Sequence, residues 1–315
     1  MKLIITADDF TAADCIDKGI EQAIIKGCIN TVSVLVNNSG SLEKILMLHE
    51  KYPGISIGLH LTLTSGKPLS ETEKVSTLVR SSSDSRFMDI EDFDYYRIDL
   101  MELGIEMEKQ IQTFLSTGIK LDHLSCHHGI FNLFEDFFKV YMSLALKYNV
   151  PIRNPILMSR QRINGFRWSI MKREGLSKAF KLIDDLGIMR IIRTTMETNP
   201  KTIAKRMIRY SFGNISCPDF FIDTYYGKGT KYRLKKILKK TTKGALSELV
   251  VHLADESPCE DLINGINSNY IKGRQKELKN LLKVNTKKYI TEHEYMDWGK
   301  FNDSRKVTEN PFFQY

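Results

Sequence analysis

Short apolar runs alternate with longer amphipathic stretches along the first part of the chain. Leu3 to Ala7 is a continuous run of the kind that forms a buried strand. Apolar positions then recur at helical spacing from Ile16 to Ile24, and Gly27 marks a helix end. The β-branched segment 31–36 returns to strand. This region therefore predicts one strand–helix–strand unit with parallel strands.

The same alternation continues downstream. Helices are predicted at 41–52 and 99–115, and strands at 55–63, 120–124, 150–153, 220–223 and 249–253. Thr11, with Asp14 three positions later, has the spacing of a capping box and predicts how the first helix starts. Alternating strands and helices predict α/β architecture, and polar residues at strand ends favour a barrel. Without a repeat or a linker, residues 1–315 are predicted to form one domain.

One region differs from the rest in charge. The chain carries a net charge of +8, but residues 151–245 hold 22 Lys and Arg against 6 Asp and Glu. Within it, residues 156–210 are helical in character and predict an insertion or lid, while 301–315 would be a C-terminal tail. The basic stretch is either a solvated face or a surface for an anionic partner, such as a phosphate-bearing substrate or acidic lipid. It contains no nucleic-acid motif, so a nucleic-acid partner is not expected.

Composition predicts a cytoplasmic protein without disulfides. The N-terminal apolar run is too short for a secretory signal, and no run approaches the roughly 20 apolar residues of a membrane span. The five cysteines are odd in number and include no C-x-x-C pair, which argues against a disulfide framework and a thiolate zinc site. They are predicted to be small buried hydrophobes, with Cys126 set apart because it lies beside a histidine cluster.

Candidate chemistry follows three of the predicted strands. Asp8 and Asp9 end the first strand, His60 lies in the strand at 55–63, and three of the seven histidines fall within residues 123–128. If these strands lie side by side, their polar ends converge where α/β sites form. Two imidazoles and a carboxylate suit zinc with an open position for water. Asp8 could then take the proton from that water, and a metal's charge is expected to keep both aspartates ionised.

Several segments resemble the YdjC-like carbohydrate deacetylase family. Thr6-Ala7-Asp8-Asp9-Phe10 resembles its opening motif, and residues 58–64 with Gly66-Lys67-Pro68-Leu69 resemble its second. Weaker similarities follow at Glu106, Gln110-Ile111, 123–127, Arg153-Asn154-Pro155, Pro218-Asp219, 248–252, Tyr270, Arg274 and Glu277-Leu278. The similarity runs from Met1 to about Leu282.

The resemblance implies a distorted TIM-like (β/α) barrel that removes N-acetyl groups from amino sugars with one divalent metal, zinc in preference to magnesium. Asp9, His60 and His127 would hold the metal, with Asp8 as general base and His252 as general acid. It also implies substrate contacts from three further side chains, Arg153, His128 and Asp219. An anionic or lipid-linked glycan and a homodimer are compatible with it.

This chain departs from the family pattern at two places. In the third motif, Ser125 stands where the family has an aspartate two residues before the metal histidine, and Gly129 and Phe131 stand where it has further histidines. After His252, Leu253-Ala254-Asp255 replaces the family's Pro-Gly. The first change is expected to weaken or reorganise metal binding, and Asp255 could raise the pKa of His252. Two other functions stay open: a catalytically silent barrel that binds a glycan or anionic lipid, and a metal-dependent hydrolase of another bond, such as a phosphoester.

Overall fold

The computed structural model describes residues 2–90, 93–154, 215, 217–218, 220–223, 225, 229–240, 246–259 and 268–286. Within them, a six-stranded sheet has the order β4-β3-β2-β1-β6-β5, and every pairing is parallel. The strands are β1 (Lys2–Phe10), β2 (Thr31–Val34), β3 (Ser56–Leu61), β4 (Leu124–Cys126), β5 (Phe220–Ile222) and β6 (Leu246–Val251). All residues of β2, β3, β4 and β6 are buried, as expected for a parallel sheet covered on both faces.

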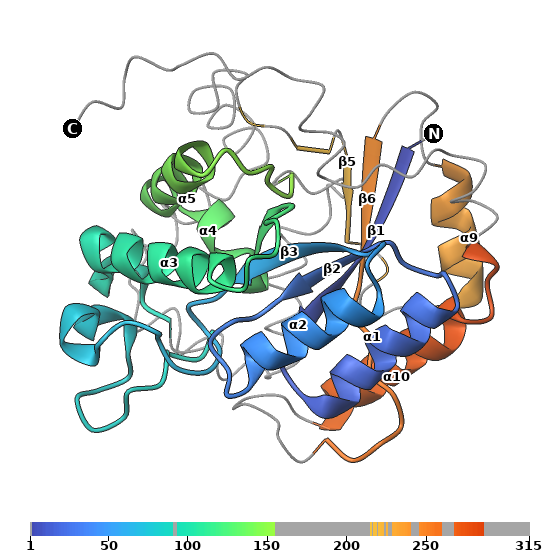
Figure 1. Cartoon of the computed structure of the whole chain (residues 1–315), viewed down its shortest axis with the longest axis horizontal. Helices are drawn as coiled ribbons and strands as arrows, with labels where there is room; N and C mark the ends of the chain where they lie inside the picture. Colours follow the sequence, from blue (N-terminus) through green and yellow to red (C-terminus); the bar gives the residue numbers. More distant parts are fainter. Residues whose placement is uncertain are drawn as a thin grey trace, which may run out of the picture.

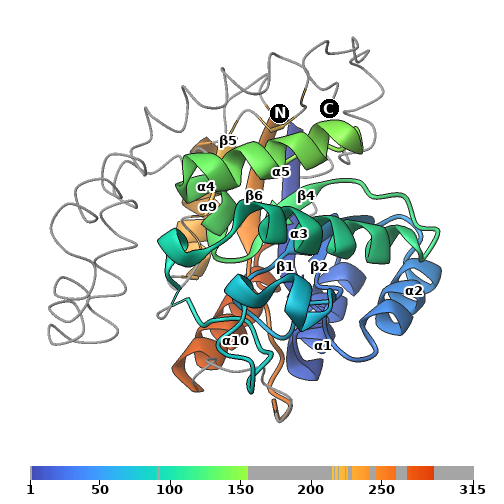
Figure 2. The same cartoon turned by 90° about the vertical axis from the view of Figure 1, so that its left-hand side faces the viewer.

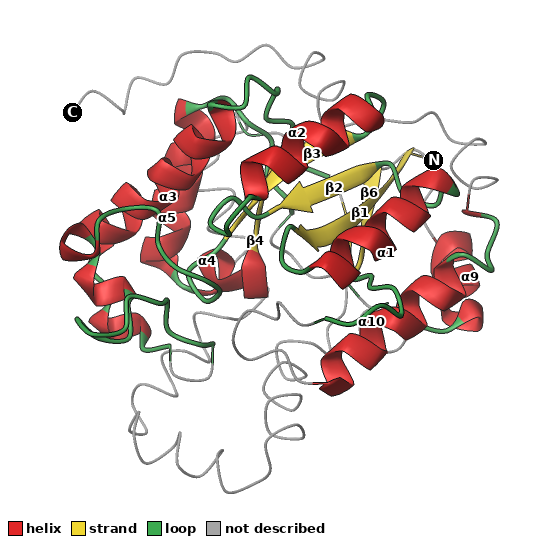
Figure 3. Cartoon of the chain, turned by 60° about the horizontal axis from the view of Figure 1, so that its bottom comes forward, coloured by secondary structure: helices red, strands yellow, loops and turns green. Residues whose placement is uncertain are grey.

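Helices pack around this sheet (Figure 1). They are α1 (Asp14–Ile25), α2 (Ser41–Lys51), α3 (Leu100–Leu115), α4 (Ile130–Leu133), α5 (Glu135–Lys147), α9 (Lys231–Lys240) and α10 (Ser268–Leu281). α3 lies beside α5 on one flank (Figure 2), while α1 lies beside α10, which also touches α9 (Figure 3). The first three strands are therefore joined by helical crossovers, and their carboxyl ends share one edge of the sheet.

The predicted alternation of strands and helices is confirmed, with differences at the boundaries. Gly27 and Gly118 follow α1 and α3 with φ of 64° and 73°, the left-handed geometry of helix ends. The capping box is wrong: α1 has Ala13 as its N-cap without a side-chain cap, and the Thr11 hydroxyl donates to the Leu35 carbonyl instead. The predicted strand at 150–153 is reduced to one bridge between Ile152 and Leu124.

A closed barrel stays a prediction, because the described strands form a row whose edges are β4 and β5. The predicted insertion at 156–210 and tail at 301–315 lie outside the described residues. No helix in the described ranges is long and apolar enough to cross a membrane.

The segment after β3 is fixed by one buried acid. Glu106 on α3 is fully buried, and its carboxylate accepts hydrogen bonds from the backbone N–H groups of Leu69 and Ser70, at 3.0 and 2.9 Å. Gln110, one turn along α3, donates to Glu106 and to the Thr62 carbonyl, both at 2.8 Å. These hydrogen bonds hold the segment that follows β3 against α3.

Candidate metal centre

Three predicted ligands come together at the carboxyl edge of the sheet. Asp9 lies in β1, His60 lies in β3, and His127 follows β4 directly. Asp9 Oδ1 is 3.3 Å from His60 Nε2 and 3.0 Å from His127 Nδ1. One ligand atom from each residue lies within 4.8 Å of the others, and no other such group occurs in the described ranges.

A bulge near the end of β1 places both aspartates in this site. Successive side chains of a regular strand point to opposite faces, so Asp8 and Asp9 would separate. Instead the register with β2 shifts between Ala7 and Phe10, and Asp9 has φ of 70°. Aspartate tolerates this left-handed conformation better than most residues. As a result both carboxylates face His60, whose Nε2 is 3.9 Å from Asp8 Oδ2.

The spacing of the donors fits a tetrahedral metal site. Zinc binds imidazole and carboxylate at about 2.0–2.2 Å, which separates two ligands of a tetrahedron by about 3.4 Å. The two separations from Asp9 Oδ1, 3.0 and 3.3 Å, are close to this value. His60 and Asp9 are buried, and His127 retains 13% exposure. The three residues therefore suit one zinc-like ion that is reached from the side of His127.

Ser125 orients His60. The Ser125 hydroxyl lies 2.7 Å from His60 Nδ1 and 3.5 Å from the Leu59 carbonyl oxygen. A hydroxyl that donates to the carbonyl can accept from Nδ1–H, and this tautomer leaves the lone pair of Nε2 facing Asp9. His60, a predicted metal ligand, therefore has an orienting partner in the neutral hydroxyl of Ser125, the position at which the family pattern has an aspartate.

Arg153 holds Asp8. Its Nη1 and Nη2 donate to the two oxygens of Asp8, at 2.7 and 2.8 Å, and its Nε donates to Glu248 at 2.9 Å. Burial alone would raise the pKa of Asp8, but the Arg153 guanidinium, together with smaller contributions from His60 and His252, holds that pKa below its ordinary value. The substrate contact predicted for Arg153 stays a prediction, since its fork is already engaged by the chain's own carboxylates.

A second buried arginine, Arg274 of α10, holds Asp9. Its Nη2 donates to Asp9 Oδ2 and to the Tyr270 hydroxyl, and the guanidinium lies 4.5 Å from the Tyr270 ring centre. Burial raises the pKa of Asp9, whereas Arg274 and His127 lower it to well below its ordinary value. The expectation that a metal is needed to keep both aspartates ionised is therefore wrong: two arginines provide that charge. Both arginines lie in segments that resemble family motifs, but no pattern in the sequence indicates this role.

His252 stands next to the aspartates across the sheet. It follows Val251, which pairs with Ala7, and its backbone N–H donates to Glu277 Oε2 at 3.0 Å. Burial and the Arg274 charge lower the pKa of His252 to about 3, although Asp8 and Asp9 oppose the shift. Asp255 is not among the groups that raise this pKa, so the expected increase is contradicted. The ring is neutral at pH 7 in the metal-free chain.

The remaining predicted site residues have different surroundings. His128 is exposed, adopts φ of 56°, and its Nδ1 lies 2.9 Å from the Thr64 hydroxyl. His123 is fully buried, and its Nε2 lies 2.9 Å from the Ser33 hydroxyl. Asp219 lies outside the described residues.

The cysteine prediction is wrong at one pair. Cys15 and Cys259 form a disulfide, with their Cα atoms 5.4 Å apart. They are 244 residues apart in the sequence, so neither spacing nor pattern could reveal their proximity. Cys28 is buried and outside any disulfide, as predicted for a small apolar side chain. Cys126, which the sequence set apart, is also buried and outside any disulfide, and Cys217 is partly exposed.

Comparison with known proteins places this chain in a family. A model of the YdjC-like protein family matches residues 2–292. A protein named carbohydrate deacetylase from Brevibacillus brevis is 28% identical over 252 residues, which cover 79% of this chain and 94% of the relative. Another protein of that name, from Halalkalibacterium halodurans, is 33% identical over 174 residues, covering 54% of this chain and 69% of the relative.

Among solved structures, a protein from Enterococcus faecalis V583 that was provisionally assigned to cellobiose-phosphate cleavage matches with a TM-score of 0.69. The two sequences are 23% identical, and the match covers 94% of this chain and 97% of the other protein, which shows a shared fold. Since the family model extends over nearly the whole chain, this protein belongs to the YdjC-like protein family.

Proposed function

We propose that this protein is a metal-dependent carbohydrate deacetylase that removes an N-acetyl group from an amino sugar. The observation that carries the proposal is the convergence of Asp9, His60 and His127 within 4.8 Å beside a second, arginine-held aspartate. Family membership and relatives named carbohydrate deacetylase support the same activity. The arrangement of these side chains and the membership of the YdjC-like family both favour hydrolysis of an amide bond.

Asp9, His60 and His127 would hold one divalent ion, zinc in preference to magnesium. When bound, such an ion supplies Lewis-acid polarisation and a more acidic water. Asp8 is the proposed base. Its bidentate pair with Arg153 keeps the carboxylate ionised and fixes its orientation, and a general base of this kind contributes about 10²–10⁴-fold to rate.

His252 is the proposed acid toward the departing amine. Because its pKa is lowered to about 3, it must receive a proton during turnover. Asp8 acts electrostatically on His252 and takes a proton from the attacking water, so we propose that this proton is relayed to His252 and then to the amine. The charge of Arg274 disfavours the protonated form of His252, so a proton that reaches this ring is readily passed on to the departing amine.

The test combines metal content with turnover of an N-acetylated amino-sugar disaccharide. We expect one zinc per chain and release of acetate, both lost in the double variant His60→Ala, His127→Ala. Full zinc stoichiometry in that double variant would refute the metal assignment. A zinc-loaded wild type that binds the disaccharide without releasing acetate would favour the silent binding barrel, and cleavage of a phosphoester instead would favour the other hydrolase.

The adjacent aspartates separate the roles of base and ligand. Asp8→Asn should retain zinc and lose about 10²–10⁴-fold in kcat, because only the base is removed. Asp9→Asn should lose zinc as well, measured by metal analysis after dialysis. Equal zinc loss in both variants would mean that the two carboxylates share the ion and that another group is the base.

A further inference from the structure

The segment that carries His252 has no regular secondary structure of its own. Residues 252–259 leave β6 and form neither helix nor strand. Leu253 and Ala254, which replace the Pro-Gly of the family pattern, are fully buried. The position of His252 therefore depends on what this segment contacts after the strand ends.

Its main support is α1, the helix that follows the two aspartates. The backbone N–H of Asp255 donates to the Cys15 carbonyl at 2.8 Å. A Cβ added to Gly19 would lie 2.7 Å from the Ala254 backbone, so the segment rests directly on the helix. From the other side, Gln275 of α10 donates to the Asp255 carbonyl at 2.9 Å.

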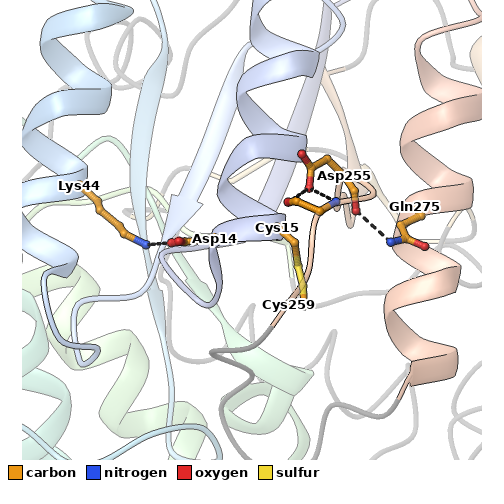
Figure 4. The surroundings of a disulfide bond; sticks show 7 residues. Asp14, Cys15, Lys44, Asp255, Cys259 and Gln275 are labelled. Carbon is orange, nitrogen blue, oxygen red and sulfur yellow. Dashed lines mark hydrogen bonds and ion pairs between the residues drawn. A yellow bond between two sulfur atoms is a disulfide. The ribbon is translucent and has the colours of Figure 1, made fainter.

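The disulfide between Cys15 and Cys259 closes this contact covalently (Figure 4). It joins the helix after β1 to the segment after β6, and these two strands are neighbours paired from Lys2↔Leu246 to Ala7↔Val251. Asp8 follows Ala7 in β1, and His252 is the first residue after β6. The crosslink therefore joins the two chain segments that determine the position of His252, the proposed acid, relative to Asp8, the proposed base.

Access to the two sulfur atoms is unequal. Cys15 is fully buried, whereas Cys259 is partly exposed. Thiol chemistry therefore begins at Cys259. With glutathione disulfide as oxidant, the Cys259 thiolate attacks one sulfur and releases one glutathione thiolate. The Cys15 thiolate then attacks Cys259 Sγ and releases the second glutathione. The two cysteines lose two protons and two electrons, which the oxidant accepts, and a dithiol reverses both steps.

We propose that Cys15 and Cys259 are positioning residues for His252, and that closing or opening their crosslink sets the order of residues 252–259 and hence the rate of the proposed reaction. The effect on rate rests on the proposed function, whereas the effect on order does not. Misplacement of a reacting group by about 1 Å can cost up to about 100-fold in rate, so a loosened segment is expected to lower kcat by roughly 10- to 100-fold. KM and zinc content should stay unchanged.

The experiment uses the full zinc-loaded chain, oxidised with glutathione disulfide or reduced with dithiothreitol. Mass mapping without reductant detects the Cys15–Cys259 peptide, and amide hydrogen exchange measures the order of residues 252–259. Turnover of an N-acetylated disaccharide gives kcat and KM separately. We expect the oxidised chain to show the linked peptide, slower exchange and the higher kcat, and reoxidation to restore all three.

Two variants provide the controls. Cys259→Ser leaves the buried Cys15 in place and should exchange and turn over like reduced wild type, without a response to oxidant. Cys217→Ser removes another partly exposed cysteine and should respond like wild type. The proposal is overturned if no linked peptide forms, or if exchange of residues 252–259 is the same in both redox states. A redox-dependent exchange difference with no turnover in any form would support the positioning role and reject the deacetylase function.

Discussion

At the scale of single residues, each of three side chains in the site is oriented by a neighbouring side chain that hydrogen-bonds to it. Ser125 holds the ring of His60, Arg153 holds Asp8 and Arg274 holds Asp9. Such partners tune a metal ligand or base by setting its tautomer, orientation and charge. Their contribution can be measured apart from that of the ligands, because each can be removed while the ligands remain.

Removing the Ser125 hydroxyl should weaken zinc binding. Loss of an outer partner typically costs about 10–100-fold in metal affinity, so we expect Ser125→Ala to raise the zinc Kd by that factor. Ser33→Ala is a matched control, because it removes a buried serine hydroxyl 2.9 Å from a different histidine, His123, which is not a proposed ligand. Competition with a chromogenic chelator gives the Kd values. An equal change in both variants would show that Ser125 acts only through general stability.

The neutral ring of His252 should make the metal-free fold sensitive to acid. Its pKa is about 3 in the folded chain, against an ordinary value of 6.5. Between these values the unfolded chain binds a proton at this ring and the folded chain does not, so stability falls as pH falls. We expect the Tm of wild type to decrease more steeply than that of His252→Gln from pH 6.5 to about pH 4. Parallel slopes would contradict the neutral state of the ring.

At the scale of elements, α1 connects the two halves of the site. It follows the bulged end of β1, and its buried face supports the segment after β6 at Cys15 and Gly19. A helix position facing a backbone at this distance admits only glycine. The packing of one turn of α1 therefore determines where the His252 segment can lie.

Adding a methyl group at Gly19 should destabilise the protein, although alanine is favoured over glycine in helices by about 1 kcal/mol. The new Cβ would clash with Ala254 at 2.7 Å, and overpacking costs about 1–3 kcal/mol. Gly273→Ala on α10 is the matched control, because a Cβ there meets nothing within 4 Å. Thermal unfolding should show a lower Tm for Gly19→Ala and an equal or higher Tm for Gly273→Ala. A rise in both would mean that the segment moves aside at no cost.

At the scale of the whole molecule, α9 and α10 present a strongly basic surface. Lys272, Lys276 and Lys279 follow one exposed face of α10, and the exposed Lys283 lies just after its end. Arg274 extends toward Asp9 from the buried side of the same helix. The adjoining α9, of sequence KYRLKKILKK, contains no acidic residue. In the part of the chain that the structure describes, no ion pair involves these four lysines. The sequence leaves open whether the basic stretch 151–245 is a solvated face or binds an anionic partner. This surface, which joins α9 from that stretch to α10, is where the second alternative can be tested.

Its effect on an anionic substrate should depend on salt. A surface of one charge can raise association rates by about 10–10³-fold, and ionic strength screens this attraction. We expect kcat/KM for an anionic N-acetylated glycan to fall more with added salt than kcat/KM for a neutral one. The triple variant with Lys272, Lys276 and Lys279 changed to Glu should remove the difference. If both glycans respond equally in wild type, the lysines form a solvated face without a role in substrate capture.

The sequence by itself determined the elements and the identity of the central residues. Hydrophobic periodicity placed β1, β2, β3 and their helices because burial on a sheet or along a helix face imposes a local period. Asp9, His60 and His127 meet in the structure because parallel strands end at a common edge. The order of the strands predicts that polar residues converge there, whereas the resemblance to the YdjC-like family is what singles out these three as ligands.

Only the tertiary structure decided what surrounds those residues. The bulge that turns Asp8 and Asp9 to one side depends on how β1 pairs with its neighbours. Arg153 reaches Asp8 across 145 residues, Arg274 reaches Asp9 across 265, and Cys15 meets Cys259 across 244. Such contacts leave no local period in the sequence, because they form between segments that the folded sheet brings together.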